Sequence, residues 1–256
     1  MRCFAFDIET IPDTDLGARL LGLQGISAKD TAKAMSFYQM QEKGSDFLPL
    51  YQHKVVAISV AWRSADGFKV WSLGTEDSDE KELVQRFFDG IDRFSPELVS
   101  WNGGGFDLPV LHYRALLHGI QSARYWEMGD GDREFKYNNY LSRFHWRHID
   151  LMDVLSGFQN RARAPLDAVA TMLGFPGKMG MAGDKVWDTY LNGGIREIRN
   201  YCETDVLNTY LVYLRFEHMR GHLDDETLLS EFKLVRAALE TSGEAHLQEF
   251  LGAWKI

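Results

Sequence analysis

The chain has 256 residues, of which 45% are hydrophobic and 13% aromatic, and its formal net charge is −9 at pH 7. This size and composition exclude a disordered chain and favour one domain spanning residues 1–256 with a substantial buried core. The negative charge excludes indiscriminate electrostatic binding to nucleic acid, which needs Lys and Arg at phosphates, but does not exclude an enzyme that acts on nucleic acid.

The first predicted element is a strand over residues 2–9, "RCFAFDIE", in which apolar side chains alternate along the chain. Successive side chains of a strand face opposite sides, so one face carries Cys3, Ala5, Asp7 and Glu9. Asp7 and Glu9 are therefore two like charges that point the same way from a half-buried element. Such a pair requires a compensating group.

The next segment, residues 13–53, contains a short helix over residues 27–43 and is predicted to be an insertion near the sheet edge. Two more strands follow at residues 54–64 and 67–74, joined by the turn Ala65-Asp66-Gly67. Three consecutive strands indicate a meander at one edge of a sheet.

A helix over residues 78–94 comes next, with Ser78 or Asp79 as its N-cap. A buried strand over residues 97–103 and a helix over residues 106–119 follow. The meander and this helix–strand–helix alternation predict an α/β fold, in which a mixed sheet of meander and parallel strands is flanked by helices.

The remaining chain is expected to be irregular over residues 120–164, except for a helix that Asp150 caps. From Asp167 onward the pattern is largely helical, interrupted by the glycine-rich loop of residues 174–185. Two further helices are predicted in a C-terminal extension, residues 217–256. We expect no polymerase domain in this chain.

The helix over residues 194–216 places a carboxylate among apolar side chains. With about 3.6 residues per helical turn, Asp205 falls between Val212 and Ile198 around the helix, in the middle of an apolar stripe. An unpaired carboxylate that faces a core is costly, so either a cation meets Asp205 or the group is protonated.

Asp107 follows the predicted fourth strand and three glycines, which permit close approach of the backbone. Sites gather at strand ends of open sheets, so we expect Asp7, Glu9, Asp107 and Asp205 to converge there. Carboxylate oxygens suit Mg²⁺ or Mn²⁺, and two such ions ~3.5–4 Å apart can clamp the attacking and leaving oxygens of phosphoryl transfer.

Each of these residues also has an ordinary structural explanation. A D-x-E pair at a strand end is typical of a solvated terminus, and Asp107 alone is typical of an N-cap. Tyr201 and Asp205, one helical turn apart, could form a simple hydrogen-bonded pair. The combination of all the signals in this order favours a metal site.

The same motifs resemble those of the DEDD superfamily of metal-dependent 3′→5′ exonucleases, which have an RNase H-like fold. The D-x-E motif matches Asp7 and Glu9 in "FDIET", N-x-x-x-F-D matches Asp107 in "NGGGFD", and Y-x-x-x-D matches Tyr201 and Asp205 in "YCETD". The last motif is that of the tyrosine subclass, DEDDy. The phrases "HIDLMDVL" and "YCETDVLNTYLVYLR" are similar to predicted exonucleases related to the proofreading domain of family-B DNA polymerases.

The resemblance implies a role for each matched position. Asp7 would bridge two divalent cations, Glu9 and Asp205 would complete the site of the ion that activates water, and Asp107 would hold the second ion. Tyr201 would orient the attacking water, because a neutral phenol with a pKa of about 10 is a poor base at pH 7. Hydrolysis at the 3′ end would release nucleoside 5′-monophosphates.

Substrate contacts are predicted at residues beside these motifs. Thr10 and Ile11 follow the first motif, while Asn102 and Phe106 belong to the second and could instead only shape its turn. Lys178 and Lys185 lie in the glycine-rich loop, which either closes over phosphates or is a solvated linker. Basic and aromatic residues over 143–148 suit a groove for a single strand, although the aromatics could equally be core.

The function that these observations favour is a 3′→5′ exonuclease acting on single-stranded DNA or RNA. A nucleic-acid binding module without turnover and a small-molecule phosphodiesterase on the same fold are the alternatives. A proofreading role would require a polymerase on a separate chain, and a repair enzyme is an alternative partner. The sequence leaves the oligomeric state open.

The two cysteines, Cys3 and Cys202, are too few for a disulfide framework and indicate a reducing compartment. An acidic residue at position 7 interrupts the N-terminal apolar run, and no stretch is long enough to span a bilayer. We therefore expect a cytoplasmic protein without a membrane partner.

Overall fold

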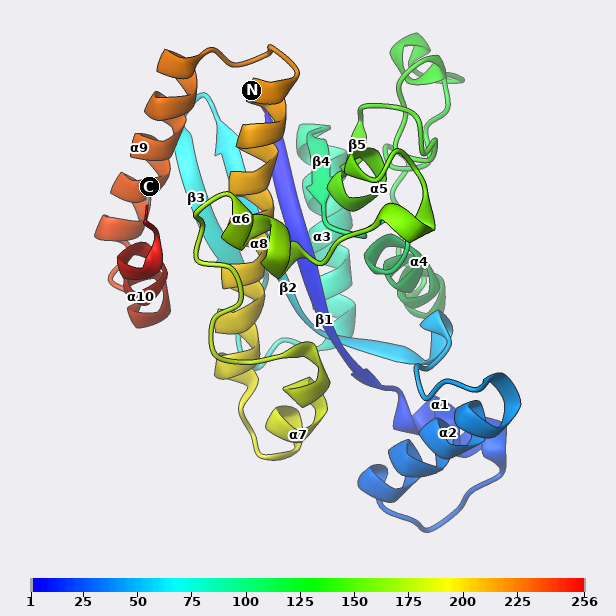
Figure 1. The fold of residues 1–256 in the computed structure, drawn as a ribbon. Coiled ribbons are helices and arrows are strands. Elements are labelled where there is room, and N and C mark those ends of the chain that lie inside the picture. The colour runs from blue at the N-terminus through cyan, green and yellow to red at the C-terminus, as the bar shows by residue number, and fades with distance from the viewer. Residues whose placement is uncertain (1, 256) are drawn as a thin grey trace.

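The computed structural model describes residues 2–255 and contains one five-stranded sheet with the order β3-β2-β1-β4-β5 (Figure 1). Its strands are β1 (Cys3–Pro12), β2 (His53–Ser64), β3 (Gly67–Ser72), β4 (Glu97–Ser100) and β5 (His148–Asp150). The first three strands pair antiparallel, whereas β4 and β5 continue the sheet in parallel with β1. The predicted meander with added parallel strands is confirmed, and the fold is RNase H-like.

Helices cover both faces of this sheet and form the C-terminal part of the chain. The α-helices are α1 (Thr14–Leu21), α2 (Ala28–Lys43), α3 (Glu80–Phe94), α4 (Asp107–His118), α5 (Leu151–Leu155), α6 (Leu166–Met172), α7 (Val186–Leu191), α8 (Ile195–Met219), α9 (Asp225–Thr241) and α10 (Ala245–Ala253). Short 3₁₀ turns are η1 (Leu50–Gln52), η2 (Arg133–Lys136), η3 (Asn160–Ala162) and η4 (Gly183–Lys185). None of the helices within residues 2–255 combines the length and apolar character needed to cross a bilayer.

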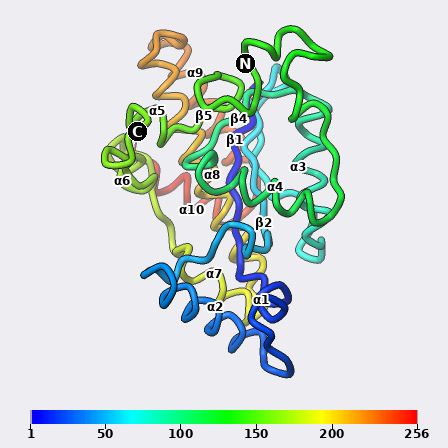
Figure 2. Tube along the Cα trace, turned by 90° about the vertical axis from the view of Figure 1, so that its right-hand side faces the viewer, coloured from blue at the N-terminus to red at the C-terminus, as the bar shows by residue number. Residues whose placement is uncertain are grey.

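The central strand β1 divides the core into two layers, as its alternation predicts. Phe4 and Phe6 pack with residues of α3 and α4 on one face, while Cys3 and Ala5 pack with residues of α8 and α9 on the other. Figure 2 shows α3 and α8 on opposite sides of β1. Both faces of the strand are therefore buried, and the face toward α8 is the one that carries Asp7 and Glu9.

The C-terminal helices belong to the same core as α8. Phe232 and Leu239 of α9, Phe250 of α10 and the following Trp254 are all at most 6% exposed and lie in the cluster that also contains Tyr210 of α8. The two predicted helices are present as α9 and α10. Rather than forming a peripheral extension, they complete the layer that covers the sheet.

Helices α1 and α2 connect β1 to β2 and lie beyond one end of the sheet (Figure 1). The predicted position near an edge of the sheet was wrong, because this connection begins at β1, which is the central strand of the sheet. The two ends of this connection meet where the Asp13 N–H donates to the Gln52 carbonyl at 2.8 Å. Helix α1, which was not predicted, begins at an N-cap formed by the side chain of Asp13.

A buried ion cluster joins this connection to the rest of the molecule. The Arg114 guanidinium of α4 binds Asp13 at 2.6 Å and forks onto Glu80, the first residue of α3. Glu80 also accepts a hydrogen bond from the Val55 N–H at 2.6 Å. Arg114 and both carboxylates are at most 6% exposed, so the cluster is fully desolvated.

Two boundaries differ from the prediction for local reasons. The strand expected over residues 97–103 ends at Ser100, because Asn102 adopts a left-handed backbone with φ of 65° and turns the chain. Strand β5 was not predicted, since three residues are too short to show alternation. Asp79, rather than Ser78, caps α3 by accepting from the Glu82 N–H at 2.8 Å.

Candidate active site

The four predicted carboxylates come together between β1, α4 and α8. Side-chain ligand atoms of Asp7, Glu9 and Cys202 lie within 4.8 Å of one another, which places the middle of α8 directly over β1. The Cys202 thiol donates to the main-chain carbonyl of Asp7 at 3.4 Å and fixes this approach. The two acids of β1 therefore face α8 side by side.

Asp107 reaches the same place from α4. Its Oδ1 accepts a hydrogen bond at 3.2 Å from the N–H of Ile8, the residue between the two acids of β1. Asp107 is the first residue of α4 and Phe106 occupies the N-cap position, so the alternative of a simple N-cap was wrong. Its carboxylate joins α4 to the end of β1.

Asp205 completes the cluster from α8, where Tyr201 lies one turn earlier. Burial raises the pKa of the Asp205 carboxyl group to about 6, although the neighbouring Tyr201 hydroxyl and the Lys178 charge lower it. Burial, and then the negative charges of Asp205 and Glu9, raise the pKa of Tyr201, so the phenol stays neutral. Tyr201 and Asp205 therefore act on each other within the acidic cluster.

Burial and mutual repulsion raise the pKa of the other acids. Burial is the main cause for Asp7, followed by the charges of Asp107, Glu9 and Asp205. Burial also raises the pKa of Glu9, with Asp205 and Asp107 adding to it. Burial raises the pKa of Asp107 to about 7, against hydrogen bonds from its own backbone N–H and that of Ile8. Each charge therefore acts on its neighbours.

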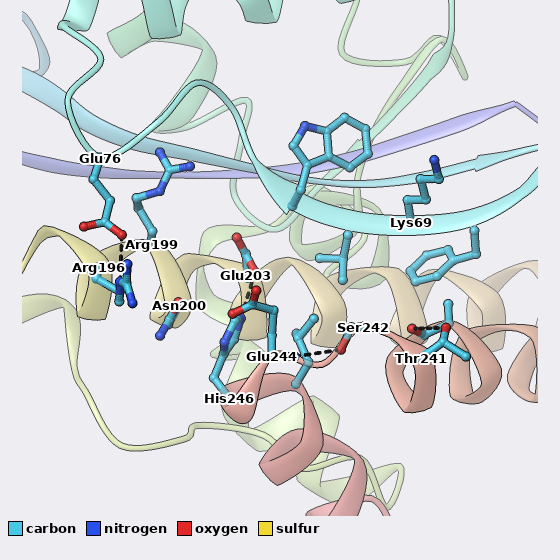
Figure 3. Close-up of a pocket in the computed structure, with 15 residues that line it drawn as sticks. Lys69, Glu76, Arg196, Arg199, Asn200, Glu203, Thr241, Ser242, Glu244 and His246 are labelled. Carbon is cyan, nitrogen blue, oxygen red and sulfur yellow. Dashed lines mark hydrogen bonds and ion pairs between the residues drawn. The ribbon is translucent and has the colours of Figure 1, made fainter.

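Elsewhere in the molecule, two acids of a cavity have basic side chains as partners. This cavity of about 660 Å³ lies between β3, α8 and the α9–α10 junction, where Glu76 pairs with Arg196 and Glu203 hydrogen-bonds with His246, both at 2.7 Å (Figure 3). By contrast, within residues 2–255 no Lys, Arg or His forms an ion pair with any of the four clustered carboxylates.

This acidic cluster fits divalent cations. Several carboxylates gathered in a buried place cannot all ionise near pH 7 unless positive charge joins them. Oxygen ligands from Asp and Glu are those that Mg²⁺ and Mn²⁺ prefer. The residues that would hold such ions are Asp7, Glu9, Asp107 and Asp205.

Comparison with known proteins gives the family. The family model described as "Predicted 3'-5' exonuclease related to the exonuclease domain of PolB" matches residues 45–254, which is most of the chain. The chain belongs to this family. The matched region contains Asp107, Tyr201 and Asp205, whereas β1 with Asp7 and Glu9 precedes it.

Two curated relatives of this PolB-related exonuclease are catalytic subunits of DNA polymerase epsilon. The one from Saccharomyces cerevisiae is 27% identical over 150 residues, covering 56% of this chain and 6% of that protein. The one from Dictyostelium discoideum is 29% identical over 147 residues, covering 55% of this chain and 6% of that protein. The chain thus spans only a small part of the length of these relatives.

The predicted substrate residues of the first motif lie in different environments. The Thr10 hydroxyl is 2.9 Å from Nδ1 of His53, at the partly exposed end of β1. Ile11 is 4% exposed and packs with Val186, Ile198 and Cys202, which disfavours a side-chain contact with substrate.

Asn102 shapes the turn of the second motif, the alternative considered for it. Its carbonyl accepts from the N–H groups of Gly105 and Phe106, both at 2.9 Å, and its own N–H donates to Asp150 at 2.9 Å. The Phe106 ring lies at the partly exposed start of α4 and contacts His53. Phe106 therefore belongs to an aromatic contact, whereas Asn102 belongs to the turn.

The glycine-rich loop contributes one of its two predicted lysines to the site. The Lys178 N–H donates to Asp167 at 2.6 Å, and the Lys178 charge lowers the pKa of Asp205. Asn208 of α8 holds the loop by donating to the Gly177 carbonyl and accepting from its N–H. Lys185 instead is exposed and pairs with Asp184.

The loop and the C-terminal helix enclose a cavity of about 440 Å³ beside Tyr201. Met179 and Met181 line it from the loop, and His246 and Glu249 line it from α10. Helix α10 therefore contributes to the surroundings of Tyr201.

Sequence reasoning missed a further role for Asp150. Besides capping α5 it accepts hydrogen bonds from the N–H groups of Asn102 and Gly104, both at 2.9 Å, and its charge raises the pKa of Asp107. It therefore braces the loop that presents Asp107. No local pattern signals this role, because β5 is too short to be predicted and its pairing with β4 is a tertiary contact.

The groove predicted over residues 143–148 is only partly present. The Arg147 guanidinium lies over the Phe135 ring at 3.9 Å, and His148 is buried against the Ser100 hydroxyl at 2.8 Å. Arg143 lines a cavity of about 370 Å³ with Gly104 and Gly105, although it also pairs with Asp153. Only part of this basic stretch therefore faces the side of the site near Asp107.

The raised pKa values predict how the exonuclease responds to pH without metal. A carboxyl group whose pKa is higher in the folded than in the unfolded state stabilises the fold below its unfolded pKa, and this stability is lost as pH rises through the folded pKa. For Asp205 that window extends from about 4 to about 6. We therefore expect Asp205→Asn to raise the free energy of unfolding in EDTA by on the order of 1 kcal/mol at pH 8, and by less at pH 5.

Urea unfolding of wild type and Asp205→Asn in EDTA, from pH 5 to pH 8, measures the difference between their free energies of unfolding. Asp184→Asn is the matched control, because the Asp184 side chain is 71% exposed, and we expect it to leave the pH dependence unchanged. A gain from Asp205→Asn that did not grow with pH would contradict the expected cost of burying the ionised carboxylate.

Proposed function

We propose that this chain is a two-metal-ion 3′→5′ exonuclease of the DEDDy type that shortens single-stranded DNA or RNA and releases nucleoside 5′-monophosphates. The observation that carries the proposal is the convergence of Asp7, Glu9, Asp107 and Asp205, with which no basic side chain of residues 2–255 forms an ion pair, in a chain of the PolB-related exonuclease family. Membership of that family supports the 3′→5′ direction.

The side chains have separate tasks in this mechanism. Asp7, Glu9, Asp107 and Asp205 would hold two divalent cations, Mg²⁺ or Mn²⁺. The bound ions supply Lewis-acid activation of water and neutralise charge that develops on the phosphoryl oxygens. Tyr201, kept neutral, would orient the attacking water by a hydrogen bond without taking its proton.

The burial of the acids supports an unpaired substrate. Glu9 is 8% exposed and Asp107 is 3% exposed, so a scissile phosphate must enter between β1, α4 and α8 to reach them. The flexible end of a single strand can enter this space. In a duplex, by contrast, the phosphates lie on the outside of a wide double helix, which cannot enter. The chain's net charge of −9 likewise favours a substrate that is bound through only a few contacts to its phosphates.

A nuclease assay with 5′-labelled single-stranded DNA and RNA of matched sequence tests the proposal. With Mn²⁺ or Mg²⁺ we expect a ladder of products that shorten one nucleotide at a time from the 3′ end, and no product in EDTA. A closed circle of the same sequence is the matched control and should persist, because it has no end.

Other outcomes would replace the proposal. Binding of the strands without shortening in either metal would indicate a nucleic-acid binding module. Hydrolysis of nucleotides or small phosphodiesters, with no shortening of the strands, would indicate a small-molecule phosphodiesterase. Cleavage of the circle would contradict exonuclease action.

A further inference from the structure

Three aromatic rings, those of Phe106, His53 and Phe47, contact one another beside the acidic cluster and form the aromatic group. Phe106 immediately precedes Asp107, and its ring centroid lies 5.2 Å from that of His53. The Phe47 ring follows, 5.3 Å from His53 and 6.0 Å from Phe106. Phe47 comes from the connection that carries α1 and α2, and His53 is the first residue of β2, so this connection extends to the site.

Hydrogen bonds fix the His53 ring of the aromatic group. His53 Nε2 lies 3.2 Å from the carbonyl of Leu48, which can only accept, so this nitrogen carries the proton. Nδ1 then accepts from the hydroxyl of Thr10 at 2.9 Å, and Thr10 directly follows Glu9. Burial lowers the pKa of His53, which agrees with a neutral ring. The aromatic group is thus tied through His53 and through Phe106 to residues adjacent to the carboxylates.

Phe47 is the exposed member of the aromatic group. Its side chain is 57% exposed, although the next residue, Leu48, is 6% exposed and anchors the segment. A large apolar ring that is held in place and left open to solvent near a nuclease site has the properties of a stacking surface. Aromatic rings bind unpaired bases in this way with little dependence on sequence.

We propose that Phe47 stacks on an unpaired base of the strand whose 3′ end lies at the acidic cluster. The proposal rests on the function proposed above and adds a binding residue that lies outside the three acidic motifs. The partner is the base itself, so the contact should serve DNA and RNA alike. A duplex end, whose bases stack on each other, should gain less from it.

Binding of a 5′-fluorescein-labelled single-stranded decamer, measured by anisotropy in EDTA, tests this without turnover. We expect Phe47→Ala to weaken binding about ten-fold, the range typical of one base–ring contact, and Phe47→Tyr to retain most of the affinity. Phe37→Ala is the matched control, because Phe37 of α2 is 67% exposed, and it should change binding less than two-fold.

A second decamer, without bases at its last three nucleotides, identifies the contact. Wild type and Phe47→Ala should bind this strand equally, because the ring then has no base to meet. Equal binding of the normal decamer by wild type and Phe47→Ala would overturn the proposal. So would a loss of affinity from Phe47→Ala that is as large on the abasic strand as on the normal decamer.

The nuclease assay separates this inference from the proposed function. Wild type that binds strands without shortening them would refute the exonuclease and still leave Phe47 tested by the anisotropy comparison. Wild type that shortens strands, together with a Phe47→Ala variant of unchanged affinity, would refute only the stacking contact. Wild type that does neither would overturn both.

Discussion

Replacing Asp7 by Ala is expected to abolish Mn²⁺-dependent shortening of a single strand while leaving the protein folded. Asp7 lies within 4.8 Å of Glu9 and is repelled by Asp107 and Asp205, so it is the common neighbour of the whole cluster. Loss of a ligand for ions that neutralise transition-state charge removes several kcal/mol, and we expect activity to fall by about 10³-fold or more. Initial rates on the 5′-labelled strand measure this loss.

Two comparisons make the result specific. Circular dichroism and urea unfolding should show Asp7→Ala as stable as metal-free wild type or slightly more so, because one repelling charge is gone. Tyr201→Phe keeps every carboxylate and is expected to lower activity more mildly, with Mn²⁺ affinity unchanged. Undiminished activity of Asp7→Ala would refute the proposed site.

The largest effect on stability is expected from Arg114→Ala. Arg114 binds Asp13 and Glu80 in a place where all three residues are at most 6% exposed. Removal of the guanidinium leaves two buried carboxylates without their main partner, and breaking a buried pair in this way costs about 3–5 kcal/mol. Urea unfolding at pH 7 measures the change.

Arg86→Ala is the matched control for this variant. Arg86 pairs with Glu82 on the surface of α3, where the side chains are 53% and 42% exposed, and such pairs contribute about 1 kcal/mol or less. Similar small losses from both variants would show that the Arg114 cluster does not hold the α1–α2 connection in place.

The sequence predicts the acids of the site well because their signals are local. Alternation places Asp7 and Glu9 on one face of β1, and the helical period places Asp205 on the apolar side of α8. Both placements agree with the packing of Cys202 against Asp7. Asp7 and Glu9 lie on the central strand β1, and Asp205 lies on the helix that crosses it, α8. Most of the cluster therefore comes from only two elements.

Other features depend on tertiary contacts that no local pattern reveals. Whether Asp107 caps α4 or turns toward Ile8 is decided by the backbone of the glycine loop, in which Asn102 has a positive φ. Asp150 braces that loop only because β5 lies beside β4. Phe47 and His53 approach Phe106 across more than fifty positions of the chain, so their spacing carries no signal.

The closed base of the α1–α2 connection has a consequence for how such enzymes diverge. Because Asp13 and Gln52 join its two ends, the segment between them can lengthen, shorten or change sequence without altering the register of β1 and β2. The entropic cost of a longer closed loop grows only slowly with its length. Evolution can therefore vary the segment that carries Phe47 while the carboxylates, fixed on β1, α4 and α8, stay in place.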